Sequence, residues 1–458
     1  MTNRLSFRSV WVAMVALIVP LAACDLDELL TVTDPDTINE ATTEDPDFVD
    51  VLVAGAYGDF VVAYSGGGGD AFVSSTGVLS DELTSTGTFT TRTATDTREQ
   101  QKPSDGNLSD GAYTNLQQAR RALWKATTAV ADNPDKGTGD PDYHELTALW
   151  GYTFVALGEG YCSYVPISND ETLDPADGPP RTSAELFEAS LTIFDGSNTD
   201  VAKIGKARAL LNLGRYAEAA SAVSGVATTY NYFMVHSDNG ARNPLYSLQS
   251  NGRYAISHNE GGNKTGVGFR GGDGEDPANA DPRLPWFEDP AGGFNPDFRL
   301  FVSHKYPAFS SDLVLASGVE ARLIEAEAAL NTGGDWLGIL NNLRANVGTL
   351  MAAQIEDYSD VVANPTLAPL ADPGTAAARM DLLMDERAMW LWGTGHRVGD
   401  LRRMINNYGR TEASVYPSGA YHKGGMHGTE VVFPIDFDEG NNTLFDASQC
   451  VTTSASWN

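Results

Sequence analysis

Residues 201–226 read VAKIGKARALLNLGRYAEAASAVSGV, a stretch with the pattern of two short helices joined by a turn. The residues that carry the pattern stand at offsets 0, 3, 7, 9, 12 and 16: Ala207, Leu210, Gly214, Tyr216, Ala219 and Val223. The small side chains of Ala207 and Ala219 let the two helices cross closely, and Gly214 permits the turn. The spacing matches a tetratricopeptide unit, and the alternative is a helical hairpin that matches by chance.

Apolar residues recur at helical spacing in several other segments as well. Together these patterns predict helix pairs near residues 111–160, 184–226, 319–345 and 374–404. One such pair cannot bury its own apolar face, so we expect the pairs to stack on each other. The sequence therefore predicts a mainly α fold, a tetratricopeptide-like helical-repeat scaffold with long irregular loops and a few short strands.

Two stretches between the predicted helices lack this periodicity. Residues 61–110 contain four consecutive glycines and many Ser and Thr residues, and residues 228–310 are rich in Gly, Asn, Asp and Pro. This composition predicts irregular loops with short strands. Long loops on a helical scaffold are usually functional, so we expect a ligand to bind on this side.

The composition excludes several classes of protein. Of 458 residues, 61 are acidic and 30 basic, for a formal net charge of −31, and such a surface repels nucleic acid. Hydrophobic residues make up 42%, which excludes wholesale disorder. Three cysteines exclude a disulfide-dense domain and a cysteine-rich zinc framework. The acidic run from Asp273 to Asp281 lacks the ligand spacing of a calcium loop, so no metal site and no cofactor are predicted.

The N-terminus has the form of an export signal. Arg4 and Arg8 precede an apolar run that ends near Pro20, and Leu21-Ala22-Ala23-Cys24 has the form of a bacterial lipobox. We predict a signal peptide over residues 1–23, lipidation at Cys24, and an acidic tether over 24–47 that leads to a single domain over 48–458. The alternative is an ordinary signal peptide followed by an unmodified cysteine.

Cys162 and Cys450 are the two other cysteines. In an oxidising compartment they can form a disulfide that joins the middle of the chain to its tail. The alternative is two separate buried thiols, because sequence does not give the distance between the two residues.

Charged side chains gather near the end of the last predicted helix pair. They are Glu386, Arg387, Arg397, Asp400, Arg402 and Arg403. Their density beside two tryptophans predicts a buried, structural ion-pair cluster. A catalytic acid–base site is the alternative, but no nucleophile is evident and His396 is the only histidine nearby. We therefore predict no catalytic residue.

Sugar binding requires flat aromatic faces with amide or guanidinium groups beside them. Candidates in the two irregular stretches are Phe72, Phe89, Arg92, Asn243, Tyr246, Tyr254, Arg270, Trp286 and Phe287. For each aromatic side chain the alternative is ordinary packing in the core.

Several short motifs follow one another in a fixed order along the chain. They are Cys24-Asp25-Leu26-Asp27, Leu52 to Tyr57, Ser80-Asp81-Glu82, Tyr113 to Arg121, Asp281-Pro282-Arg283-Leu284, Lys305-Tyr306, Arg322 to Ala328, Asn341 to Arg344, Asp385-Glu386-Arg387, Gly395 to Arg403, and Phe433-Pro434-Ile435. In this order and spacing the sequence resembles the SusD/RagB family of outer-membrane nutrient-uptake lipoproteins. Residues 388–394 lack the acidic side chains that the family carries after its Glu-Arg pair, which indicates a divergent member.

The resemblance implies a function as well as a fold. Members of the family are not enzymes: they hold a glycan or another nutrient and pass it to a SusC-like, TonB-dependent transporter in the outer membrane. The expected partners are thus this transporter, the nutrient, and the membrane through the lipid anchor. No ligand residue is carried over, because the loops do not align by motif. The rival hypothesis is a tetratricopeptide scaffold that assembles envelope proteins without a small ligand.

Overall fold

The computed structural model describes residues 48–99, 108–168, 178–259 and 267–458. The signal peptide predicted over residues 1–23, the lipidation at Cys24 and the tether over 24–47 lie outside these described residues. Across the described ranges, no helix has the length and apolar character needed to cross a bilayer.

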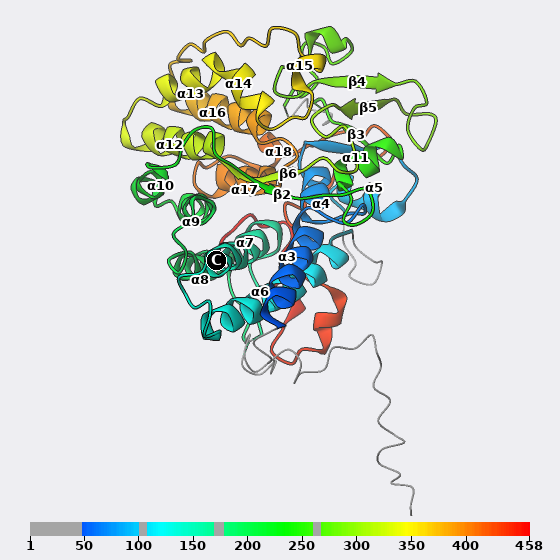
Figure 1. The fold of residues 1–458 in the computed structure, drawn as a ribbon. Helices are drawn as coiled ribbons and strands as arrows, with labels where there is room; N and C mark the ends of the chain where they lie inside the picture. The colour runs from blue at the N-terminus through cyan, green and yellow to red at the C-terminus, as the bar shows by residue number, and fades with distance from the viewer. Residues whose placement is uncertain (1–47, 100–107, 169–177, 260–266) are drawn as a thin grey trace, which may run out of the picture. The chain divides into compact units, whose positions relative to one another are not determined.

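Helices form most of the regular structure (Figure 1). The longer ones are α3 (Val49–Tyr64), α6 (Leu108–Asp132), α7 (Pro141–Gly160), α8 (Ser183–Phe194), α9 (Asp200–Asn212), α10 (Tyr216–Val223), α12 (Gly318–Thr332), α13 (Trp336–Ala345), α16 (Ala376–Trp390) and α17 (Arg397–Asn406). The predicted mainly α fold class with helical hairpins is confirmed.

The helix boundaries follow from local chemistry. Thr182 and Glu185 form a capping box at the start of α8, with Glu185 N–H donating to Thr182 Oγ1 at 3.2 Å. Asp335 accepts from Gly338 N–H at 2.9 Å and starts α13. Between α9 and α10, Gly214 has a φ of +71°, a left-handed conformation that glycine adopts without strain.

Successive helices pack as neighbours within the unit Val49–Asn458. Helix α6 contacts α3 and α7, α7 contacts α8 and α9, and α10 contacts both α9 and α12. Helix α12 then contacts α13 and α16. Figure 1 shows α6, α7 and α8 side by side, with α12, α13 and α16 grouped in the same way. This neighbour-to-neighbour stacking is how repeat scaffolds bury their core.

One aromatic ring fixes how closely α7 and α9 approach α8. Phe194 is 2% exposed, and its ring lies against two glycines, Gly151 in α7 and Gly205 in α9. A Cβ atom added at Gly151 or Gly205 would stand 2.6 Å or 2.5 Å from that ring. Tyr152 packs edge-on against the same ring, with centroids 5.5 Å apart. The glycines therefore make room for Phe194 between the helices.

We expect Gly205→Ala to lower the free energy of unfolding by about 1–3 kcal/mol, because a methyl group here overpacks a closed core. Chemical unfolding of the variant beside the wild type measures this. Gly225→Ala is the control, because a Cβ atom there meets nothing within 4 Å. Equal stability of Gly205→Ala and the control would contradict the packing argument.

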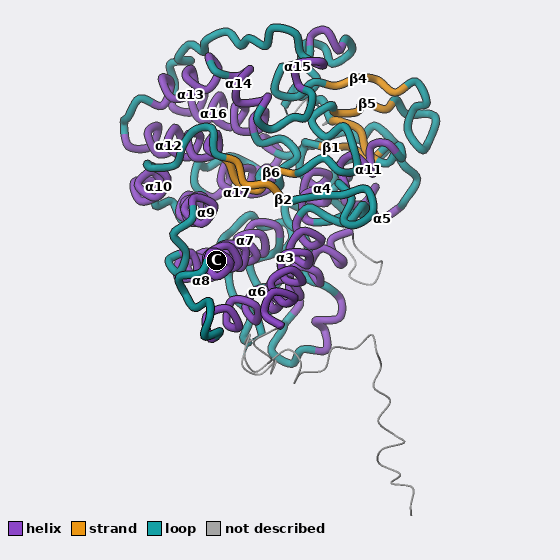
Figure 2. The backbone as a smooth tube through the Cα atoms, in the orientation of Figure 1, coloured by secondary structure: helices purple, strands orange, loops and turns teal. Residues whose placement is uncertain are grey.

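In the ranges that the structure describes, the strands form three separate antiparallel pairs. The pairs are β1 (Leu83–Ser85) with β3 (Tyr254–Ile256), β2 (Asn231–Met234) with β6 (Leu313–Ser317), and β4 (Trp286–Asp289) with β5 (Leu300–Ser303). Figure 2 shows them as short segments set among loops. The prediction of a few short strands in long irregular segments is thus confirmed for residues 228–310.

The stretch 61–110 is less irregular than predicted. It contains the end of α3, together with α4 (Phe72–Leu79) and α5 (Thr90–Asp96). All eight residues of α4 are buried, including Ser74, Ser75 and Thr76, so its polar and apolar residues do not separate into an exposed and a buried face that would reveal a helical period. Helix α5 reads TTRTATD, and threonine is a poor helix former.

Short elements complete the described chain. They are α11 (Pro244–Ser250), α14 (Val347–Ala352), α15 (Tyr358–Val361), α18 (Glu412–Val415), and the 3₁₀ turns η5 (Pro277–Asn279), η6 (Phe437–Asn441) and η7 (Ala447–Gln449).

The C-terminal tail packs against α7 and α8, two helices from the first half of the sequence. Phe433 N–H donates to Gly160 O at 2.8 Å, and Ala184 N–H donates to Trp457 O at 2.8 Å. Figure 1 places the C-terminus beside α8. Cys162 and Cys450 are joined by a disulfide with Cα atoms 5.2 Å apart, across 288 residues of sequence. The tail is thus tied to the end of α7 by hydrogen bonds and a covalent link.

Candidate ligand-binding site

Three loops meet at the edge of the β1–β3 pair where β1 ends and β3 begins. Thr86 N–H donates to Arg253 O at 2.9 Å, and Thr86 Oγ1 donates to Gly252 O at 2.8 Å. Gly252 O also accepts from Phe294 N–H at 2.7 Å. Gly252 has a φ of +65°, and a Cβ atom there would stand 2.6 Å from the backbone of Phe294. Glycine is therefore required for this close approach.

The side chains above this junction form what we call the Phe–Arg strip: Phe89, Arg253 and Phe294. The guanidinium carbon of Arg253 lies 4.7 Å from the centre of the Phe89 ring and 3.5 Å from that of Phe294. Phe89 is 50% exposed and Phe294 is 52% exposed. Two half-exposed aromatic rings in contact with the same guanidinium suit a sugar ring, which has an apolar face and polar edges.

A second arginine borders the strip. Arg92 lies 4.9 Å from the centre of the Phe89 ring and 5.5 Å from that of Tyr254. Its charge is balanced by Asp70, which accepts from Arg92 Nε at 2.8 Å and from the Tyr254 hydroxyl at 2.6 Å. Burial raises the pKa of Tyr254 well above its ordinary value, so the hydroxyl stays protonated and donates. The Arg92–Asp70 pair therefore anchors α5 beside the strip.

Lys423 and Phe298 lie beside the same three-loop junction. Lys423 Nζ donates to Ser85 Oγ and to Gly87 O, both at 2.9 Å, and lies 5.5 Å from the centre of the Phe298 ring. Phe298 O accepts from Gly293 N–H at 2.8 Å, which ties this aromatic residue to the loop that carries the strip.

The structure brings only part of the predicted ligand set together. Phe89, Arg92 and Tyr254 meet at the strip, although the ring of Tyr254 is itself buried. Tyr246 instead packs edge-on against Phe309, with ring centroids 4.9 Å apart. Phe287 is 36% exposed on β4, and its ring lies tilted against that of His304, with centroids 4.8 Å apart.

Four predicted ligand residues are corrected by their burial. Phe72 is fully buried in α4, and Asn243 is the buried N-cap of α11, accepting from Tyr246 N–H at 3.1 Å. Arg270 donates to Ile256 O and Gly274 O, while Trp286 Nε1 donates to Arg270 O at 2.8 Å. These four side chains stabilise the fold and offer no surface to a ligand.

Sequence reasoning missed Arg253 and Phe294. Arg253 directly precedes Tyr254, and Phe294 follows Gly292-Gly293 in the β4–β5 loop. A large aromatic residue in a glycine-rich turn was the available signal, since turn tips lie at the surface. The contact between the two side chains depends on the three-loop junction and has no local signature.

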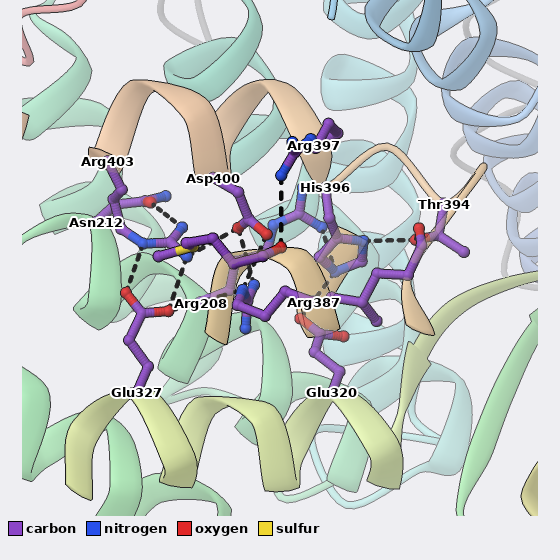
Figure 3. A network of polar contacts seen from close by, with 12 residues as sticks. Arg208, Asn212, Glu320, Glu327, Arg387, Thr394, His396, Arg397, Asp400 and Arg403 are labelled. Atoms are coloured by element: carbon purple, nitrogen blue, oxygen red, sulfur yellow. Dashed lines mark hydrogen bonds and ion pairs between the residues drawn. The ribbon is translucent and has the colours of Figure 1, made fainter. Parts of the chain in front are cut away.

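The predicted charge cluster is buried at the meeting of α9, α12, α16 and α17 (Figure 3). Asp400 binds Arg387 through two hydrogen bonds of 2.9 Å and Arg403 through one of 2.8 Å. Glu327 accepts from Arg403 at 2.9 and 3.0 Å. Although burial opposes it, the pair of arginines holds the pKa of Asp400 far below its ordinary value.

Two members of the predicted cluster have other partners. Glu386 binds Arg283 at 2.8 Å and Arg344 at 2.5 Å rather than Arg387. Arg402 forms no ion pair among the described residues: it donates to the carbonyl oxygens of residues 158, 159, 161, 455 and 456 and to a serine hydroxyl. Without a carboxylate beside it, burial lowers the pKa of Arg402 to about 10.

Another bidentate pair joins α17 to the loop before β1. Arg397 donates to Asp81 at 2.7 and 2.8 Å, and both side chains are buried. Two of the motifs found in the sequence, one containing Asp81 and one containing Arg397, are therefore joined by a buried ion pair.

His396 belongs to the same buried region and has structural partners. Its Nδ1 lies 2.8 Å from Thr394 Oγ1, and its Nε2 lies 3.0 Å from Arg208 Nη1 (Figure 3). Burial and the Arg208 charge lower the pKa of His396, so the ring is neutral at pH 7. Only 3% of this residue is exposed, which leaves no room for a substrate. In the described ranges no group of His, Cys, Asp and Glu side chains is placed to hold a metal ion.

Glu82 is a buried side chain whose carboxyl group is stabilised in its protonated form. Its Oε1 accepts from Gly393 N–H at 2.9 Å. Burial, with a smaller contribution from Asp81, raises its pKa to about 8 against the opposing effects of the Gly393 N–H, Arg397 and Lys305. The folded protein thus binds a proton between pH 4.5 and 8 that the unfolded chain releases.

We expect the wild type to lose stability relative to Glu82→Gln as pH rises from 5 to 8. The sign follows because unfolding releases the proton that only the folded state binds, and this release becomes more favourable as pH rises. Glutamine keeps the oxygen that accepts from Gly393 and does not titrate. Urea unfolding at pH 5, 6.5 and 8 measures the difference, and parallel curves for the two proteins would contradict the raised pKa.

Comparison with known proteins identifies the fold. No family model and no curated protein matches the sequence. Among solved structures, a SusD/RagB family protein from Bacteroides thetaiotaomicron is similar over 87% of this chain and 94% of its own, with a TM-score of 0.58 and 13% identity. A SusD-like carbohydrate-binding protein from Bacteroides vulgatus covers 78% of this chain and 83% of its own, with a TM-score of 0.54 and 16% identity.

A laminarin-binding SusD-like protein is similar over 87% of this chain and 98% of its own, with a TM-score of 0.52 and 14% identity. At these identities the likeness establishes the fold. The chain has the SusD/RagB fold, so the predicted resemblance is confirmed at that level.

Proposed function

We propose that this protein is a divergent SusD-like lipoprotein that binds a glycan at the cell surface and delivers it to a TonB-dependent transporter. In this proposal residues 1–23 are the signal peptide, Cys24 carries the lipid anchor in the outer membrane, and residues 24–47 are the tether. Residues 48–458 form the binding body.

The observation that carries the proposal is the SusD/RagB fold over most of the chain, with the exposed Phe–Arg strip on its surface. Two structural neighbours are a carbohydrate-binding and a laminarin-binding protein, which supports a glycan as the ligand here. The disulfide supports export, since disulfides persist in oxidising compartments.

The proposed mechanism is capture without chemistry. Glu386, Arg387, Arg397, Asp400 and Arg403 are held in buried ion pairs within the protein, and His396 has no access to a substrate. Incubation of pure protein with each glycan that it binds is expected to give no product. Hydrolysis above the background rate would contradict this part of the proposal.

Binding is tested with the lipidated protein in mild detergent and a panel of soluble glycans, by calorimetry. Phe89→Ala and Phe294→Ala are each expected to weaken binding about tenfold, because each removes a stacking face worth about 1–1.5 kcal/mol. Phe287→Ala is the matched control, an exposed phenylalanine outside the strip. If both strip variants bound glycan with the affinity of the wild type, the Phe–Arg strip would not be the binding site.

Delivery is tested by mild-detergent isolation of the tagged protein from native outer membranes, with mass spectrometry of the proteins recovered. A TonB-dependent barrel in near-equal amount supports delivery. Recovery of envelope-assembly proteins without a barrel would instead support the scaffold hypothesis.

A further inference from the structure

Arg253 is a cation without a counterion. Among the described residues, no carboxylate pairs with it and its guanidinium donates no hydrogen bond. Its Nη1 is covered and has no partner. In a chain with 61 acidic residues, such isolation is unexpected for an arginine beside a proposed binding surface.

The contacts that Arg253 does make leave its hydrogen-bonding edge unused. Phe89 and Phe294 interact with the guanidinium as aromatic rings and accept no strong hydrogen bond from it. A guanidinium carries five N–H donors in its plane, and this fork matches a carboxylate or sulfate in a bidentate arrangement. The two rings therefore orient Arg253 without satisfying its donors.

The neighbouring charges favour an anion at this position. Arg92 is already balanced by Asp70, so that carboxylate is not available to Arg253. Burial, with a smaller contribution from the positive charge of Arg92, lowers the pKa of Arg253. Lys423 adds a further positive charge to the adjoining surface.

On the basis of the proposed function, we propose that the Phe–Arg strip selects glycans that carry an anionic group, and that Arg253 binds this group. A sugar ring lies on the exposed face of Phe89 or Phe294, and its carboxylate or sulfate accepts from the guanidinium. The strip then combines an apolar contact with a charge-assisted one, and a neutral glycan makes only the first.

The test compares charged and neutralised forms of the same oligosaccharide. Trigalacturonate and its methyl ester form one arm, and a sulfated galacto-oligosaccharide with its desulfated form makes the other. We expect at least one charged form to bind about tenfold more tightly than its neutral form, as a charge-assisted hydrogen bond adds about 1.5 kcal/mol or more. The arms separate a carboxylate ligand from a sulfate ligand. Raising NaCl from 0.05 to 0.5 M is expected to reduce this preference.

Arg253→Gln is expected to abolish the preference for the charged form, so that the charged and neutral forms of each oligosaccharide bind with similar affinity. Arg253→Lys keeps the charge but not the fork, so an intermediate preference is expected. Arg121→Gln is the matched control: Arg121 also lies over an aromatic ring, 4.8 Å from that of Trp124, and has an unpartnered Nη1. Thermal unfolding confirms that each variant is folded.

The outcomes separate this inference from the proposed function. Binding of neutral glycans without any preference for charged forms, or a preference that persists in Arg253→Gln, overturns the role of Arg253 and leaves glycan capture intact. Failure to bind any glycan in a wide panel overturns both.

Discussion

Asp400→Asn is expected to lower the free energy of unfolding by about 3–5 kcal/mol, the usual cost of leaving buried charges without their partner. The carboxylate of Asp400 is shared by Arg387 and Arg403, and all three side chains are at most 3% exposed. Asparagine has nearly the same shape but offers no charge. Two guanidinium groups would then face each other in a closed site, with Glu327 as the remaining carboxylate.

Guanidinium chloride unfolding of the two proteins at pH 7 measures the loss. Asp372→Asn is the matched control, because the Arg379–Asp372 pair has similar geometry, 2.6 Å, but lies in solvent. No measurable change is expected there. A small loss for Asp400→Asn, equal to that of the control, would contradict the structural role assigned to the cluster.

The same variant changes the acid stability of the protein. Because the folded-state pKa of Asp400 is depressed, its contribution is complete above about pH 4, the ordinary pKa of aspartate, and is lost as pH falls below that value. In Asp400→Asn this group no longer titrates. The difference in stability between the two proteins is therefore expected to shrink when measured at pH 3 instead of pH 7.

Removal of the disulfide is expected to lower the free energy of unfolding by roughly 2–5 kcal/mol, since the bond closes a very long loop in the unfolded chain. The two cysteines are 288 residues apart, from the end of α7 to the tail. Cys450→Ala is the preferred change because Cys450 is only partly buried, whereas Cys162 is fully buried in the core.

Unfolding is measured for the wild type and Cys450→Ala, each with and without dithiothreitol. The wild type in reductant is expected to match the variant, and the variant is expected to be unaffected by reductant. The tail keeps its hydrogen bonds through Phe433 and Trp457, so the folded state should persist in both. Equal stability of oxidised wild type and variant would show that those bonds alone hold the tail.

The helical part of the fold could be predicted because its signals are local. The stretch from Ala207 to Val223 shows the helical period, and Gly214 interrupts it where the turn lies. Helix α4 could not be found in this way, because its polar residues are buried together with its apolar ones and no amphipathic period results. Its position depends on packing such as that of Phe72 against Gly160, which is distant in sequence.

The candidate site was predicted less well because composition does not distinguish a ligand contact from a core contact. Trp286 and Arg270 have the right chemistry for a sugar, yet Trp286 Nε1 donates to the backbone oxygen of Arg270. The Arg270 guanidinium donates to Gly274 O and Ile256 O. Phe89 was found because it lies in a polar loop. Arg253 and Phe294 could be found only by knowing which residues contact the backbone of Gly252. Gly252 is more than forty residues from Phe294 and more than one hundred from Thr86 in the sequence.

The buried charge cluster also sets the order in which the protein can be completed. Synthesis begins at the N-terminus, so Glu327 and Arg387 are made before Asp400 and Arg403. Before α17 is synthesised, Glu327 lacks Arg403, the arginine that binds it most closely, and the surface around Glu327 is left uncovered. A chain interrupted before residue 397 therefore cannot close its interior and remains open to proteases. Residues 397–403 thus complete an interior that the earlier helices cannot close without them.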